Sequence, residues 1–387
     1  FDHVPPQLEA VMLWGVICRN KDHFLVLMAL HKYSRTNIFA FPLLSRNSCV
    51  QKKSTIHFIF LNKFKNGRMP FNTALTKTLG IKIPVVQGGM HWVGYAELAA
   101  AVSNAGGLGL EIRKCRSLTN RPFGVNITLL PSLMPPDYGA YVQAIIDEGV
   151  KVVETAGNNP GSVIRPLKEA NIIVIHKCTT IRHAKSAVKL GADFLSIDGF
   201  ECGGHVGEDD LTNLILLNRA RQVLSVPFIA SGGFADGHGL AAALALGAEG
   251  INMGTRFMCT VEAPIHIKVK EAIVAAQETD TALVMRRWKN TTRLYANKVA
   301  KDALQVETQS ESGKFEEIAP YVNGKRGQQV FLEGDVDSGV WTAGQVIGLI
   351  HDIPTCADLL ARIEQEALTS MKRTESLWTG EASQSRL

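Results

Sequence analysis

Short apolar runs rich in β-branched residues recur along the chain from residue 80 onward, and amphipathic stretches separate most of them. This alternation is typical of parallel strands joined by helices. Eight strands are expected, at Pro84–Gln87, Gly107–Leu110, Phe123–Thr128, Val150–Thr155, Ile172–Cys178, Phe194–Asp198, Pro227–Ser231 and Gly250–Met253. Helices are expected between them at Tyr95–Asn104, Pro136–Glu148, Gly161–Ala170, Ile181–Leu190 and Gly237–Leu246.

A closed barrel accommodates this pattern better than an open sheet. Eight strand–helix units, with each strand ending in glycine or a polar residue, match an α/β fold of the (β/α)8 TIM-barrel type. An open doubly wound sheet would be expected to carry Gly-x-Gly-x-x-Gly after its first strand, and residues 85–95 hold no such turn. Since barrels place their chemistry where strands end, the residues that follow each strand form the candidate site.

Residues 1–69 differ in character from the rest of the chain. They mix aromatic, Asn, Ser and Lys residues without a sustained helical or strand period. We expect an extension without assigned function, which is disordered, a targeting segment or sequence from upstream of a natural start at Met69. The barrel domain is expected over residues 70–387, with a lid-like segment at about 278–322 and a C-terminal helix that returns to the barrel.

Composition narrows the classes of protein. The 387 residues are 46% hydrophobic, enough for a large core, and no basic block with interleaved aromatic residues indicates nucleic acid binding, although the net charge is +5. Seven cysteines never form Cys-x-x-Cys, which disfavours a disulfide framework or structural zinc site and suits a cytoplasmic setting. The apolar runs Val11–Ile17 and Phe24–Leu30 are too short to span a membrane.

Glycines follow the last two expected strands. Strand seven ends in Ser231-Gly232-Gly233, and strand eight ends in Asn252-Met253-Gly254-Thr255. Barrels most often hold a phosphate at this place, through backbone N–H groups and a following helix N-terminus. Two turns that happen to be rich in glycine are the alternative.

Other strand ends carry groups suited to a planar or anionic ligand. Gly88, Gly89 and Met90 follow strand one, where paired glycines let backbone N–H groups approach a ligand or simply make a tight turn. Asn126 places an amide at the end of strand three, and Lys177 ends strand five. A lysine there needs an anionic partner, which is either the N1/O2 edge of a flavin or a salt bridge to Glu154 or Asp198.

His205 follows Gly203-Gly204 in the loop after strand six, and this position favours acid–base or substrate-binding work. One imidazole beside Glu208, Asp209 and Asp210 makes a metal site improbable, and we expect these acids to cap the helix that begins near Leu211. Cys202 is expected to be a packed or flavin-facing thiol, because no ordered Cys–His–acid arrangement can be inferred.

These strand-end motifs together resemble the nitronate monooxygenase (2-nitropropane dioxygenase) family of FMN-dependent barrels. The match runs from Thr73 to Ala367 and rests on Gln-Gly-Gly-Met, Ser-Gly-Gly and Met-Gly-Thr-Arg-Phe. Three further segments resemble the branch described as NADH:quinone reductases, namely Ile175–Lys177, Ile197–Cys202 and Gly207–Asp210.

The resemblance implies a flavoprotein oxidoreductase and gives each residue a role. It implies FMN contacts from Gly88, Gly89, Met90, Asn126, Lys177, Asp198, Gly203 and Gly204, and phosphate binding by Ser231, Gly232, Gly233, Gly254 and Thr255, beside Asn252 and Met253. His205 matches the family histidine that lies beside the flavin and deprotonates neutral nitroalkanes.

Two activities follow from the resemblance. In the first, FMN takes electrons from an alkyl nitronate and O2 reoxidises it. In the second, NADH or NADPH reduces a quinone through the same flavin. Asp198 stands where many nitronate-oxidising members have Gln, and an acid disfavours an anionic substrate, which favours the reductase. An aldolase that uses Lys177 as a Schiff base would leave the other motifs unexplained.

The resemblance is broken between strands two and three. Glu111–Arg121 is too short for a loop plus a helix of normal length, and the family has more residues here. A barrel that lacks this helix would expose core and weaken the flavin site. A flavin-binding protein with impaired turnover is therefore a third interpretation.

Two segments near the C-terminus are expected to lie beside the barrel mouth or on the surface. The basic stretch Met285–Arg293 is expected to be the solvated face of a helix, or a lid whose cations meet a dinucleotide phosphate. Asp335–Gln345 leads into an apolar helix through Ile350, and the resemblance implies that it packs over the barrel mouth. Trp341 is either part of that cover or a core anchor.

Overall fold

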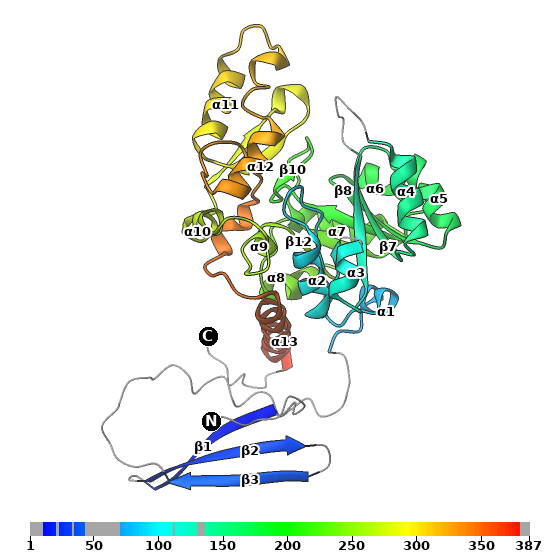
Figure 1. The fold of residues 1–387 in the computed structure, drawn as a ribbon. Helices are drawn as coiled ribbons and strands as arrows, with labels where there is room; N and C mark the ends of the chain where they lie inside the picture. The colour runs from blue at the N-terminus through cyan, green and yellow to red at the C-terminus, as the bar shows by residue number, and fades with distance from the viewer. Residues whose placement is uncertain are drawn as a thin grey trace. The chain divides into compact units, whose positions relative to one another are not determined.

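The computed structural model describes residues 11–20, 23–32, 35–42, 70–110, 113–129 and 136–379. The chain divides between Arg68 and Met69 into two compact units. In the first unit, β1 (Val11–Asn20), β2 (His23–Lys32) and β3 (Arg35–Pro42) pair antiparallel in that order (Figure 1). These strands lie where the sequence showed no sustained strand period, and the rest of the expected extension lies outside the described residues. No described helix is both long and apolar enough to cross a membrane.

The second unit is built on an eight-stranded parallel sheet. Its order is β4 (Val85–Gln87), β12 (Ile251–Met253), β11 (Phe228–Ser231), β9 (Phe194–Asp198), β8 (Ile173–Cys178), β7 (Val152–Gly157), β6 (Phe123–Leu129) and β5 (Gly109–Leu110). The two ends of this order meet, because Leu108 N donates to Val85 O at 3.0 Å and Gln87 N donates to Leu108 O at 2.9 Å. The sheet is therefore a closed barrel, and the eight expected strands and the (β/α)8 fold are confirmed.

Helices cover the outside of this barrel (Figure 1). After α1 (Ala74–Leu79), they include α2 (Ala96–Asn104), α4 (Tyr138–Asp147), α5 (Gly161–Glu169), α6 (Ile181–Leu190), α7 (Asn213–Val223) and α8 (Gly237–Ala245). Local signals set their ends: the Thr180 side chain accepts from His183 N where α6 begins, and Gly191 ends the helix in a left-handed conformation. The five expected helices are confirmed to within two residues at each end.

The short connection between strands two and three still holds a helix, α3 (Arg113–Leu118). Its Cys115 is buried against Ala96, Ala99 and Ala100 of α2. The expectation of a lost helix is therefore wrong: the helix is shortened, and it covers α2 while the barrel closes. Glu111 and Ile112 lie outside the described residues.

The eighth barrel helix lies far along the chain. A long insertion follows β12 and carries α9 (Thr255–Met258), α10 (Ile267–Ala275), β13 (Thr281–Val284), η1 (Arg286–Trp288), β14 (Thr292–Tyr295), α11 (Lys298–Gln309), η2 (Phe315–Glu317), α12 (Gly324–Glu333) and η3 (Gln345–Leu349). Only then does α13 (Cys356–Thr379) pack along α8 and α2, where Gly237 N donates to Glu366 Oε2 at 2.9 Å. The middle of the insertion, residues 281–333, projects from the barrel and is called the lid below (Figure 1).

The basic stretch of the lid is not a helix. Residues 285–293 form a single 3-10 turn, η1, and the start of β14. Strand β14 pairs antiparallel with both β13 and β10 (Gly204–His205), so a small second sheet joins the lid to the loop that carries His205. The helical interpretation of this stretch is wrong, because β pairing with the barrel loop decides its conformation.

Candidate functional site

A buried carboxylate connects the carboxyl ends of several barrel strands. Glu154 of β7 is fully buried, and its Oε2 accepts from Asn126 Nδ2 at 2.8 Å and from Gly89 N at 3.1 Å. Its Oε1 accepts from Asn252 Nδ2 at 2.7 Å. The structure thus brings together Gly89, Asn126 and Asn252 from three separate strand ends around one acid.

Lys177 of β8 lies beside the same acid. Its Nζ is 3.7 Å from Glu154 Oε1 and 3.9 Å from Asp198 Oδ1, so it is paired with both carboxylates without a direct hydrogen bond to either. Burial opposes the charge, but Asp198 and Glu154 outweigh it and raise the pKa of Lys177. The salt-bridge interpretation of Lys177 is confirmed, and its ammonium N–H groups can still be donated to a ligand.

Asp198 and Cys202 share this environment. The Asp198 Oδ1 atom is buried and accepts no hydrogen bond from the described residues. Burial raises the pKa of Asp198 although Lys177 opposes the shift. Burial, followed by the charge of Asp198, also raises the pKa of the Cys202 thiol, which therefore stays protonated and packed, as expected.

The glycines after β11 and β12 present open backbone donors. Gly232 and Gly233 have φ of +83° and +82°, and no acceptor in the described chain meets the N–H groups of Gly232, Gly233 or Gly254. Asn213 Nδ2 holds this turn by donating to Ser231 O at 2.9 Å and to Gly232 O at 2.5 Å. Free N–H groups at two adjacent strand ends are the chemistry that a phosphate needs.

The β4 loop lies against the same region. Gly88 N donates to Met253 O at 2.9 Å, and a Cβ added to Gly254 would lie 3.6 Å from Met90 Sδ. The Thr255 hydroxyl accepts from Gly344 N at 3.0 Å and so holds the C-terminal segment, and its expected part in phosphate binding stays a prediction. Its hydroxyl is therefore shared with that segment.

His205 lies at the rim, in the ladder between β10 and β14. It is aligned with Thr292, and its side chain is exposed. Partial loss of water lowers the pKa of His205, and Asn290 and Glu208 oppose this shift. The imidazole is therefore neutral at pH 7 and can accept a proton.

The acidic run after His205 fastens the lid. Glu208 accepts two hydrogen bonds from Thr291, and Asp210 pairs with Arg286 at 2.6 Å. The expected capping role is wrong, since α7 begins at Asn213 and its first N–H donates to Glu201 Oε1 at 3.0 Å.

The segment after Trp341 covers the strand-six glycines. Gln345 N donates to Glu201 O at 3.0 Å, and a Cβ on Gly203 would lie 2.8 Å from the backbone of Ala343. Trp341 is 2% exposed and stacks on Tyr295 at 4.4 Å, so it anchors the core from which this cover extends.

The sequence indicated Glu154 only as a possible salt-bridge partner of Lys177, and Arg293 only as the last residue of a basic stretch. A charged residue inside the apolar run Val150–Thr155 was the available signal for Glu154. Arg293 is buried, donates to Phe200 O at 2.9 Å and lies 4.6 Å over the Phe200 ring. No local pattern marks its contact with Phe200, because the two residues stand 93 positions apart in the chain.

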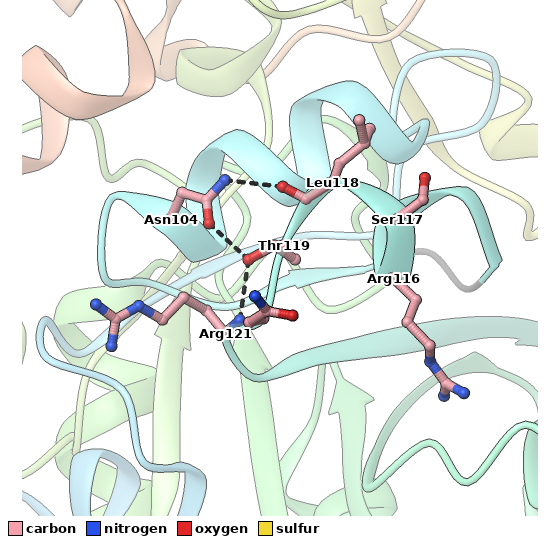
Figure 2. A pocket seen from close by; sticks show the side chains of 7 residues that line it. Asn104, Arg116, Ser117, Leu118, Thr119 and Arg121 are labelled. Carbon is pink, nitrogen blue, oxygen red and sulfur yellow. Dashed lines mark hydrogen bonds between the residues drawn. The ribbon is translucent and has the colours of Figure 1, made fainter. Parts of the chain in front are cut away.

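A separate hollow has a volume of about 490 Å³, and Figure 2 shows its lining from close by. It is lined by Asn104 and residues 116–121. Thr119 Oγ1 donates to Asn104 Oδ1 at 2.6 Å within it. Because these residues precede β6, the hollow lies at the amino ends of the strands, away from the polar cluster.

The chain is similar to known proteins over most of its length. The model of the nitronate monooxygenase family matches residues 72–366. The chain is 33% identical over 353 residues to a (3aS,4S,5R,7aS)-5-hydroxy-7a-methyl-1-oxo-octahydro-1H-indene-4-carboxyl-CoA dehydrogenase of Rhodococcus jostii, covering 79% of this chain and 97% of that protein. It is 32% identical over 268 residues to a probable nitronate monooxygenase of Staphylococcus haemolyticus, covering 55% of this chain and 75% of that protein.

Solved structures share the fold. FabK from Thermotoga maritima superposes with a TM-score of 0.73 at 34% identity, covering 79% of this chain and 99% of FabK. A nitroalkane oxidase from Streptomyces ansochromogenes superposes with a TM-score of 0.66 at 25% identity, covering 78% of this chain and all of that one.

Proposed function

The chain belongs to the nitronate monooxygenase family and is an oxidoreductase, and from this premise we propose that it works with FMN bound at the carboxyl ends of its barrel strands. One observation carries the proposal. Open backbone N–H groups of Gly232, Gly233 and Gly254 lie at two adjacent strand ends, and the Lys177 ammonium lies within the same ring of strands.

The residues fit this cofactor. The three glycine N–H groups would hold the phosphate, and Lys177 would meet the electron-rich N1/O2 edge of the flavin. Position 89 has room only for glycine, because an added Cβ would overlap the Asn126 side chain. Bound FMN would supply two-electron redox chemistry at this site.

The chain's own residues would prepare the substrate. Neutral His205 at the rim accepts a proton from a carbon acid, a compound whose C–H bond is weakened by a neighbouring nitro or carbonyl group. The lid is held to the His205 loop by Glu208 and Asp210 and would lie beside the bound substrate.

Our first candidate substrate is a nitroalkane or its nitronate, with O2 as the final acceptor. The family and the relative from Staphylococcus haemolyticus support it. Reduction of a quinone with NADH or NADPH is favoured by one residue, since the acid Asp198 beside the site disfavours an anionic nitronate.

A further candidate substrate is a thioester of coenzyme A. The Rhodococcus relative, named for a carboxyl-CoA substrate, is matched along 97% of its length. A thioester also acidifies the neighbouring C–H bond, so the same histidine would serve.

Two measurements test the proposal. Purified protein is mixed with FMN, and uptake is followed by the flavin absorption bands; protein that stays colourless after reconstitution would refute the proposal. Loaded protein is then mixed without oxygen with propyl nitronate, NADH or an acyl-CoA, and the donor that bleaches the flavin fastest identifies the electron source.

A further inference from the structure

Glu154 is a fully buried acid, and both of its side-chain oxygens accept hydrogen bonds. Three N–H groups point at its two oxygens, from Gly89, Asn126 and Asn252, so it acts purely as an acceptor, as an ionised carboxylate does. Burying such a charge costs free energy that these bonds offset in part. An acid in this place needs a reason beyond packing.

The charges around Lys177 supply that reason. One ammonium faces two carboxylates, those of Glu154 at 3.7 Å and Asp198 at 3.9 Å. A reduced flavin gathers negative charge at the edge that Lys177 would meet, so Lys177 favours the reduced form. A fully buried carboxylate 3.7 Å from the ammonium weakens this effect, because charges interact strongly where water is excluded.

Resting on the proposed FMN site, we propose that Glu154 is a positioning residue that partly neutralises Lys177 and thereby lowers the reduction potential of the bound flavin. A lower potential makes the reduced flavin a stronger donor to O2 or to an organic acceptor. The pair would set how readily the flavin gives its electrons away.

Glu154 also orients the two amides. Both asparagines turn their Nδ2 donors toward it, and Asn126 Oδ1 accepts from Thr128 Oγ1 at 2.8 Å. A neutral glutamine at position 154 would keep the size but lose one acceptor. The main effect of Glu154→Gln should therefore be the loss of the negative charge, and a reorientation of the Asn126 and Asn252 amides should be the smaller effect.

The test is the midpoint potential of the bound flavin, measured by equilibration with a reference dye. Glu154→Gln is expected to shift it to a more positive value, while Glu154→Asp, which keeps the charge, stays nearer the wild type. Glu307→Gln is the matched control: this lid acid is also buried and accepts from Met285 N at 2.6 Å and Arg287 N at 2.9 Å. It should lose stability and leave the potential unchanged.

The outcomes separate the two proposals. Wild-type protein that takes up no FMN overturns the proposed function and this inference with it. Flavin-loaded protein whose potential is the same in Glu154→Gln and wild type overturns the role of Glu154 alone. If the glutamine variant does not fold, Glu154→Ser removes the same charge and leaves room for a water molecule, and it must show the same positive shift.

Discussion

The Glu208 carboxylate accepts two hydrogen bonds from Thr291, from the backbone N at 3.0 Å and from the hydroxyl at 2.6 Å. This contact joins the lid to the loop of His205, since Thr291 stands next to the residue aligned with His205. The lid is therefore attached to the barrel through the same loop that carries the proposed base.

Glu208→Ala should loosen this attachment. Loss of two charge-assisted bonds at the surface is expected to cost about 1 kcal/mol locally and to lower turnover without changing FMN affinity. Limited proteolysis of the lid, run beside activity and flavin titration, checks this. The lid of the variant should be cut faster, and equal cutting rates would contradict the prediction.

The His205→Ala variant should still bind FMN but should no longer remove a proton from neutral nitroalkanes. Turnover of neutral nitroalkanes is expected to fall by about 10²–10⁴, while preformed nitronates react almost as before. Because the pKa of His205 is lowered, the wild type should lose activity with neutral nitroalkanes only below pH 6.5, as the imidazole takes up a proton. The variant should lack this acid limb in its pH–rate profile.

His176 should make the fold sensitive to acid. Burial lowers its pKa from 6.5 to about 4, and Thr155 Oγ1 lies 2.8 Å from its Nδ1. Between pH 6.5 and 4 the His176 side chain binds a proton in the unfolded chain but not in the folded chain. The free energy of unfolding is therefore highest above pH 6.5, and it falls toward pH 4 by an amount on the order of 3 kcal/mol. Urea unfolding at pH values between 7 and 4 should show that the free energy of unfolding depends less on pH in His176→Asn than in the wild type.

Trp341→Ala should destabilise the barrel unit strongly. The ring is buried, stacks on Tyr295 and donates from Nε1 to Val336 O at 3.2 Å. A loss of about 3–5 kcal/mol is expected for a buried tryptophan. Trp378, 80% exposed, is the control, and Trp378→Ala should change stability by less than about 0.5 kcal/mol. Denaturant unfolding of both variants measures the difference.

Gly232→Ala should weaken FMN binding both by a steric clash of the added Cβ and by strain in the backbone. An added Cβ would lie 2.8 Å from the Cys202 Cβ, and φ is +83°. Gly149 has a similar φ of +62° but nothing within 4 Å of an added Cβ, so Gly149→Ala isolates the strain. Flavin titration should show at least about tenfold weaker binding for Gly232→Ala alone. Equal affinities in the two variants would argue against the phosphate site.

Local sequence patterns predicted most of the strands and helices of the barrel. Most strands are apolar runs that end at glycine or a polar residue, and the expected helices are amphipathic stretches, of which three have a side-chain N-cap, so neighbouring residues alone mark them. The shortened α3 was harder, because its six residues are fewer than two helical turns and give no period to detect. Its burial against α2 decided that it forms.

The sequence by itself determined that strand ends with glycines, Asn126, Lys177 and His205 would gather at one face, because parallel strands in a barrel must end together. Only the tertiary structure decided the partners. Glu154 draws its donors from three separate strand ends, Glu208 binds the lid in place of capping α7, and the last two residues of the basic stretch, Thr292 and Arg293, pair as β structure with the His205 loop. These contacts join positions tens of residues apart, and burial and hydrogen bonding across such distances leave no periodic trace in the chain.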